Sequence, residues 1–119
     1  MIPVSSLLPL KPAPFHLLLA VAGGHRHAYA IRKDVERQTG GRVRLWPTSL
    51  YRTIAALAEQ GLLEEDPDQP PQDDDRNRRL YRLTPRGRQA LAAELARLRT
   101  LVDSTRELQA LLEHDGGRP

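Results

Sequence analysis

Glycine and proline residues divide this chain into short segments, and this division limits it to a small, mainly helical fold. Segments 27–39 and 47–60 carry apolar residues at helical spacing, segment 15–22 is almost wholly apolar, and glycine follows all three. Glycine commonly ends a helix, whereas proline is tolerated in the first helical turn. The sequence therefore predicts three short helices joined by tight connections.

After these segments the pattern changes to that of a hairpin and then of a long helix. Residues 62–65 and 78–83 are candidate strands on either side of a loop rich in proline and acidic residues. Thr84 is a suitable N-cap residue, and Pro85 suits the first helical position. We expect this fourth helix to continue to about residue 113 as a single element.

The order helix, helix, helix, strand, strand, long helix is that of a winged helix-turn-helix. The predicted fold class is mostly α (α+β), with a two-stranded wing and a long C-terminal dimerisation helix. Residues 1–14, with four prolines, are expected to be an irregular arm, and 15–84 the winged-helix domain. Residues 85–114 would form the dimerisation helix, and 115–119 a frayed tail.

Composition excludes several classes of protein. The chain has 119 residues and no cysteine, which excludes disulfide scaffolds and thiolate chemistry. No apolar run is long enough to span a bilayer, and no targeting segment is recognisable, so we expect a cytoplasmic protein. No nucleophile elbow or phosphate-binding loop is present, so we expect neither an enzyme nor a cofactor. His25 and His27 are spaced unsuitably for a shared metal on one helical face, so no metal is expected.

Basic residues are almost all arginine and are unevenly distributed. The formal net charge is only +3, and 16 of the 18 basic residues are arginine. Residues 64–79 hold seven acids and three arginines, whereas 26–52 hold seven bases and two acids, and 76–88 hold six arginines and no acid. Clustered arginine favours a face that binds a polyanion. A GC-rich genome would also explain the count, and a solvated surface would also explain the clusters.

Several short motifs, taken together, resemble the PadR family of winged-helix transcriptional regulators. The matching runs are 27–31 (His-Ala-Tyr-Ala-Ile), 41–45 (Gly-Arg-Val-Arg-Leu), 50–52 (Leu-Tyr-Arg) with Leu57, 61–63 (Gly-Leu-Leu) and 79–87 (Arg-Leu-Tyr-Arg-Leu-Thr-Pro-Arg-Gly). They occur in order over about residues 15–105. Ala28, Leu80 and Trp46 depart from the family pattern, and Trp46 stands where relatives often have a small N-capping residue. The short C-terminal region resembles the smaller PadR type.

The resemblance implies double-stranded DNA as a partner, with segment 47–60 as the recognition helix. Arg52 is the best candidate for reading a guanine edge, and Thr48 and Ser49 lie where a helix N-terminus favours phosphate. The full set of predicted DNA-binding residues is Thr48, Ser49, Tyr51, Arg52, Arg44, His27, Tyr29, Arg76, Arg78 and Arg79. Two alternatives stay open: an ordinary amphipathic surface helix, and internal pairing of the three wing arginines with Asp73, Asp74 and Asp75.

The apolar stripe of the C-terminal helix is too long for a small domain to cover by itself, so a second copy of the chain is its expected cover. The predicted dimer interface comprises Phe15, Leu18, Leu19, Leu91, Leu95, Leu98, Leu101, Val102 and Leu108. For the residues of the first helix, burial in the monomer core is an equally good interpretation.

The predicted function is sequence-specific DNA binding by a homodimeric regulator on a near-palindromic operator. Relatives in the family are mostly repressors, and many release DNA when a small apolar or phenolic molecule binds. Any such effector site would lie between the two subunits. The alternative function is a winged-helix protein–protein interaction module that binds no DNA and uses the hairpin and its acidic loop.

Overall fold

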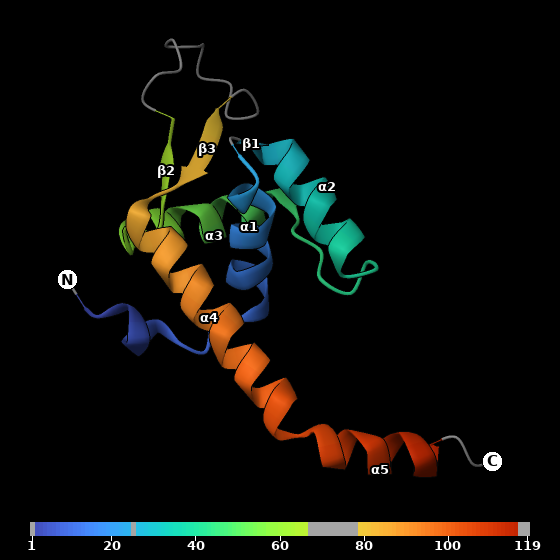
Figure 1. Ribbon diagram of the computed structural model, residues 1–119. Helices are drawn as coiled ribbons and strands as arrows, with labels where there is room; N and C mark the ends of the chain where they lie inside the picture. The colour runs from blue at the N-terminus through green and yellow to red at the C-terminus, as the bar shows by residue number, and fades with distance from the viewer. Residues whose placement is uncertain (1, 25, 67–78, 117–119) are drawn as a thin grey trace.

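The computed structural model describes residues 2–24, 26–66 and 79–116, without the side chains of Arg26, Asp115 and Gly116. The three short helices, the hairpin and the C-terminal helical region follow one another in the predicted order, and three elements that the sequence did not predict are added (Figure 1). They are the 3-10 helix η1 (Val4–Leu7), α1 (Pro12–Ala22), β1 (Arg26–His27), α2 (Ala28–Gln38), α3 (Pro47–Glu59), β2 (Leu63–Glu65), β3 (Leu80–Leu83), α4 (Pro85–Ser104) and α5 (Arg106–Gly116).

Helix α1 lies at the centre of the domain and explains why its sequence is almost wholly apolar. It packs against α2, α3, α4 and β3, so that most of its surface is covered. Leu17 and Leu18 have no exposed surface, and Ile31 of α2 and Leu57 of α3 are buried beside them in the same cluster. Helices α1, α2 and α3 with the small sheet therefore form one core, and the predicted winged-helix fold is confirmed.

Helix α3 begins and ends as the sequence predicts. Pro47 occupies its first turn, and Leu50, Ile54 and Leu57 form the buried stripe. At its end Gly61 adopts a positive φ of 76°, and the Leu62 amide donates to the Leu57 carbonyl at 2.9 Å. This is the glycine-terminated helix end that satisfies otherwise unpaired carbonyl groups.

The sheet contains the predicted hairpin and one strand more. β2 and β3 pair in antiparallel fashion, with Leu63 opposite Leu83 and Glu65 opposite Tyr81. The two residues of β1 add to the other side of β3, which gives the order β1-β3-β2. The sequence did not predict β1, because two residues show no periodicity and their partner strand is distant in the chain.

The junction between the hairpin and α4 explains the Thr-Pro-Arg-Gly run. The Thr84 hydroxyl accepts a hydrogen bond from the Gly87 amide at 2.9 Å and donates to the Gly61 carbonyl, which confirms the predicted N-cap. A β-carbon on Gly87 would lie 2.0 Å from the Leu62 carbonyl oxygen. Glycine at this position therefore lets α4 lie directly against the start of the wing.

The prediction of one continuous C-terminal helix was wrong. α4 ends at Ser104, and α5 starts at Arg106 in a different direction (Figure 1). The Thr105 hydroxyl donates to the Leu101 carbonyl at 2.9 Å, and the side-chain amide of Gln109 donates to the Val102 carbonyl at 2.7 Å. Side chains thus satisfy carbonyl groups that a continuous helix would have paired with backbone amides.

The N-terminal arm is also more regular than predicted. It contains η1, and α1 begins at Pro12 rather than at Phe15, because proline is compatible with a first turn. The arm lies along α4, where the Leu10 amide donates to the Glu94 carboxylate at 2.7 Å. Across the described ranges, none of the helices has the length and apolar character that a membrane span requires.

Candidate nucleic-acid interface

The outward face of α3 carries small and polar side chains. Thr48, Ser49 and Arg52 are exposed, on the side of the helix opposite the buried Leu50, Ile54 and Leu57. Ala55 and Ala56 continue this face and are exposed too. An exposed helical face with few bulky side chains can approach the base edges of a major groove closely. Arg52 is the long basic side chain on this face.

The N-terminal end of α2 and the loop before α3 carry three further predicted residues. His27 occupies the N-cap position of α2 without a side-chain capping hydrogen bond, and Tyr29 in the first turn is 59% exposed. Arg44 is exposed, with its guanidinium 3.7 Å from where a β-carbon on Gly41 would lie. The helix-turn-helix thus presents these three predicted residues at the surface.

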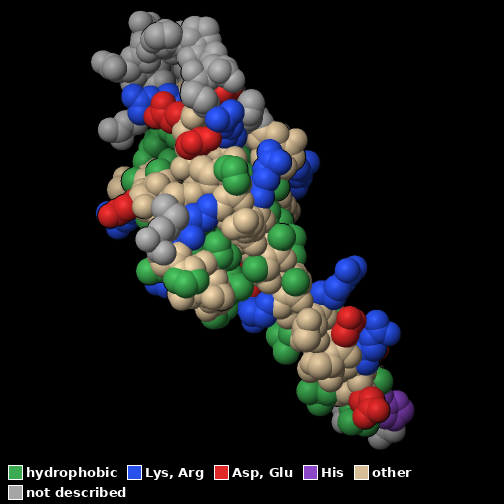
Figure 2. All heavy atoms as spheres, turned by 60° about the vertical axis from the view of Figure 1, so that its left-hand side comes forward, with side chains coloured by type: hydrophobic (Ala, Val, Ile, Leu, Met, Phe, Trp, Pro, Cys, Tyr) green, Lys and Arg blue, Asp and Glu red, His purple; other side chains and the backbone are tan. Residues whose placement is uncertain are grey.

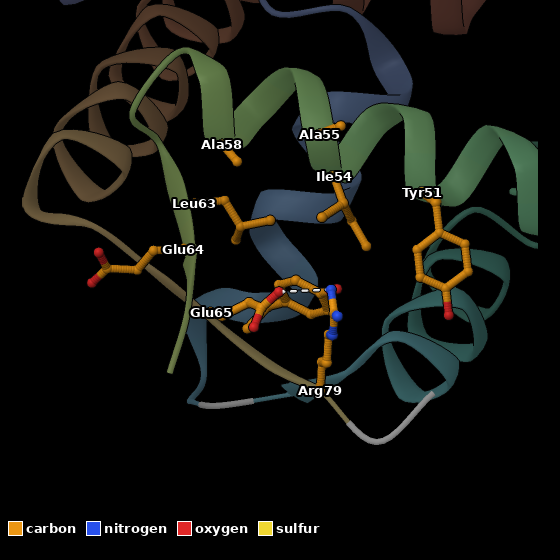
Figure 3. A pocket seen from close by; sticks show the side chains of 9 residues that line it. Tyr51, Ile54, Ala55, Ala58, Leu63, Glu64, Glu65 and Arg79 are labelled. Atoms are coloured by element: carbon orange, nitrogen blue, oxygen red, sulfur yellow. Dashed lines mark hydrogen bonds and ion pairs between the residues drawn. The ribbon is translucent and has the colours of Figure 1, made fainter. Parts of the chain in front are cut away.

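Tyr51 differs from the other predicted α3 residues because it is half-buried. It lines a cavity of about 280 Å³ between α3 and the hairpin, together with Ile54, Leu63, Arg79 and Tyr81 (Figure 3). Burial, followed by the nearby Glu65 charge, raises the pKa of the Tyr81 hydroxyl above its ordinary value. The cavity has an apolar floor and an ion pair at its rim.

That ion pair bears on the alternatives for the wing arginines. Arg79 bonds Glu65 at 3.1 Å across the hairpin, and Arg82 bonds Glu64 at 2.8 Å. Internal pairing therefore occurs at Arg79, with Glu65 as the partner that the described residues show. Arg76, Arg78, Asp73, Asp74 and Asp75 lie outside the described residues, as does His25.

The predicted interface leucines divide into two groups. Leu18 is 0% exposed and Leu91 5%, so both belong to the monomer core and are removed from the interface. Phe15 and Leu19 are half-buried against that core. The remaining predicted residues lie farther along α4 and α5, with Leu98 half-buried and the others exposed: Leu95, Leu101, Val102 and Leu108.

Two further leucines extend the exposed group. Leu111 and Leu112 of α5 are 63% and 61% exposed. Leu112 continues the apolar stripe that the sequence shows along the C-terminal helix, whereas Leu111 was not predicted as part of it. Both follow Leu108 within α5 at the spacing of three and four residues that marks one face of a helix. The C-terminal arm, α4 beyond Glu94 and α5, carries these side chains on a narrow projection (Figure 2).

No group of three or more residues able to hold a metal ion occurs within the ranges 2–24, 26–66 and 79–116. The surface features are instead those of a helix-turn-helix with a basic residue on its outer face.

Comparison with known proteins identifies the family. The sequence model of the transcriptional regulator PadR-like family matches residues 17–93, which spans the helix-turn-helix, the wing and the start of α4. The chain belongs to the PadR-like family of transcriptional regulators. The resemblance noted in the sequence motifs is thereby confirmed. No curated protein matches the chain.

Solved structures show the same fold for this PadR-like chain. RosR of H. salinarum is 21% identical in sequence and superimposes with a TM-score of 0.66, over 92% of this chain and 96% of RosR. A PadR-like transcription factor from Bacteroides fragilis is 18% identical with a TM-score of 0.65, over 88% and 97% of the two chains. A transcriptional regulator from Clostridium thermocellum is 17% identical in sequence with a TM-score of 0.61, over 87% of this chain and 94% of the other.

Proposed function

We propose that this PadR-like regulator binds double-stranded DNA specifically, as a cytoplasmic homodimer that represses transcription. The observation that carries the proposal is the outward face of α3, where exposed Thr48, Ser49 and Arg52 stand above a rigidly buried stripe. In a helix-turn-helix the second helix enters the major groove with its N-terminal residues toward the bases. Arg52 would contact a guanine edge, and Thr48 and Ser49 would contact phosphate.

Residues around α3 would position the helix on the duplex. Tyr29, His27 and Arg44 are exposed or lie at the helix-turn-helix surface, and contacts from them to phosphate would set register. We propose a smaller part for Tyr51, because it is half-buried, and for Arg79, because Glu65 already pairs with it. Arg76 and Arg78 are proposed from the sequence alone.

The proposed dimer uses the C-terminal arm. A radius of gyration of 16.9 Å exceeds the roughly 13–14 Å of a compact chain of this length. Leu95, Leu101, Val102 and Leu108 are each more than two-fifths exposed on this arm, with Leu98 beside them. A second copy of the arm would remove this apolar surface from water, and two-fold symmetry would place two α3 helices on a near-palindromic operator.

Repression and the response to an effector are the most specific parts of the proposal. They are supported by the family to which the chain belongs, whose members are transcriptional regulators. A small apolar or phenolic effector would bind between the subunits and alter the spacing of the two α3 helices. A reporter gene placed behind the operator tests repression, since deleting the regulator should raise expression.

Fluorescence anisotropy with labelled duplex from upstream of the gene tests DNA binding itself. We expect tight binding to this duplex and weaker binding to a scrambled one, with a salt slope near −0.9 for each phosphate contacted. Arg52→Gln should weaken specific binding by about 1–3 kcal/mol, a factor of roughly 5 to 150. Arg99→Gln on α4 is the matched control, because it removes the same charge far from α3 and should bind like the wild type.

Two results would contradict the proposal. Equal loss of affinity in the two arginine variants would mean that α3 contributes only general charge. No binding to any duplex at low salt would favour the protein–protein interaction module.

A further inference from the structure

We infer that Trp46, with the Arg32 guanidinium over its ring, is a DNA-contacting residue that packs on the sugar–phosphate backbone beside the groove entered by α3. The inference rests on the proposed function and adds a residue to it. Neither the helical periodicity nor the motif resemblance assigned Trp46 to the interface.

The exposure of Trp46 is the first observation. The chain has a single tryptophan among five aromatic residues, and its side chain is 58% exposed instead of lying in a core built largely from leucine. Large aromatic side chains contribute most when they are covered, and they are enriched at binding surfaces. An exposed indole in so small a protein therefore suggests a surface that is covered in a complex.

The N-cap position of α3 does not explain why a tryptophan occurs there. Trp46 is the N-cap residue of α3, and its side chain makes no capping hydrogen bond. Only its backbone carbonyl takes part, by accepting a bond from the Leu50 amide at 2.7 Å. A serine or threonine would form the same backbone bond and cap the helix as well. Helix stability thus gives no reason for an indole at this position.

The neighbouring charge is the second observation. The Arg32 guanidinium lies 5.8 Å from the centre of the Trp46 ring, and the Lys33 ammonium lies 5.4 Å from the centre of the Tyr29 ring. α2 and the start of α3 therefore present two cation–aromatic pairs on one surface. Arg32 also lies 3.7 Å from Glu36, so its side chain is held between the Trp46 ring and a carboxylate.

The location decides which partner fits. This aromatic and basic surface is continuous with Thr48 and Ser49, because Trp46 is separated from Thr48 only by Pro47. In helix-turn-helix complexes the first helix crosses the backbone while the second lies in the groove. Apolar ring surface suits the deoxyribose, and the cations suit the phosphates on either side. A contact of this kind raises affinity for all sequences and leaves base preference unchanged.

The test uses the full-length chain and the operator duplex. Trp46→Ala should lower affinity roughly tenfold for operator and scrambled duplex alike, as expected for loss of an aromatic hot-spot contact. Trp46→Phe should recover most of that loss, because a ring remains. Arg32→Gln should reduce the steepness of the salt dependence by up to about one unit, whereas Arg99→Gln should not.

The single tryptophan provides a readout that needs no substitution. Adding duplex to the wild type should change the Trp46 emission with the same midpoint as the anisotropy. If Trp46→Ala instead binds DNA as the wild type does, and the emission stays constant while anisotropy rises, the inference is wrong and the proposed function survives. Absence of DNA binding by the wild type would overturn both. Should Trp46→Ala fail to fold, Trp46→Phe, Arg32→Gln and the emission still decide the matter.

Discussion

Helix α3 and the C-terminal arm have similar amphipathic sequences, yet the apolar stripe of α3 is buried and that of the arm is exposed. In α3 the stripe is buried, with Leu50, Ile54 and Leu57 at 3%, 6% and 1% exposure. In the arm, Leu101 is 51% exposed and Leu108 52%. The first stripe lies over α1 and the sheet, whereas the second projects beyond the rest of the chain (Figures 1 and 2).

The change from the buried core to the exposed arm is abrupt and occurs within α4. On α4, Leu91 and Glu94 are buried and Leu95 is 44% exposed. Helical periodicity identifies which face of a helix is apolar, but it does not say what covers that face. The contrast indicates that α3 is stabilised within the monomer, whereas the arm would be stabilised by a second chain.

The largest expected effect comes from placing charge on the arm. Leu98→Glu combined with Leu101→Glu should abolish the proposed dimer, because burying unpaired carboxylates costs on the order of several kcal/mol per charge. Sedimentation velocity should then show monomers. Circular dichroism of the same variant should still show a folded domain. Arg99→Glu, between the two sites, is the control for added negative charge and should remain dimeric. A double variant that stays dimeric would place the interface elsewhere.

A matched pair of truncations measures the contrast directly. Leu57→Ala should lower the free energy of unfolding by about 2–5 kcal/mol, since it leaves a cavity in the core. Leu108→Ala should change the unfolding of the monomer by less than about 0.5 kcal/mol, because the side chain is already exposed there. Urea denaturation in the double-glutamate background isolates the monomer. Equal losses in the two variants would show that the arm packs on its own domain.

The smallest expected effect concerns Glu94, at the border itself. The hydrogen bond from Arg97, with that from the Leu10 amide, lowers the pKa of the Glu94 carboxyl despite its burial. The ionised form is thus bound more favourably in the folded state, so the stabilisation is present above the ordinary glutamate pKa. It is lost as pH falls through the lowered value.

Glu94→Gln should accordingly cost about 1–2 kcal/mol near pH 7 and progressively less below about pH 4. Denaturation at several pH values checks this, with Glu113→Gln on α5 as the exposed control. A constant difference between Glu94→Gln and the wild type down to pH 3 would mean that the carboxylate charge plays no part.

Local signals predicted most of the elements. Glycine after α1, α2 and α3, and the Thr84-Pro85 pair before α4, marked helix ends to within a few residues. The Gly87 of the family motif was recognised from the sequence, but its cause, close contact with the Leu62 carbonyl, depends on two elements meeting. The break at Thr105 was missed because the leucine spacing continues across it, while side-chain hydrogen bonds end the helix.

The candidate nucleic-acid interface also contains features that the sequence predicted and contacts that it did not predict. Thr48, Ser49 and Arg52 could be placed on one face from helical spacing, since neighbours on a helix are fixed by its period. The contact of the Arg32 guanidinium with the Trp46 ring and the ion pair of Arg79 with Glu65 could not be predicted in this way, because each joins residues 14 apart in the chain.

By itself, the sequence determined the order of elements, the apolar face of each helix and the family. These properties depend on residues within a few positions of one another, where backbone geometry alone sets which side chains are neighbours. The tertiary structure decided that Leu18 and Leu91 lie in the core while Leu101 and Leu108 stay exposed. The reason is that burial depends on which distant elements pack against a face, and in the described part of the chain Leu101 and Leu108 remain about half exposed.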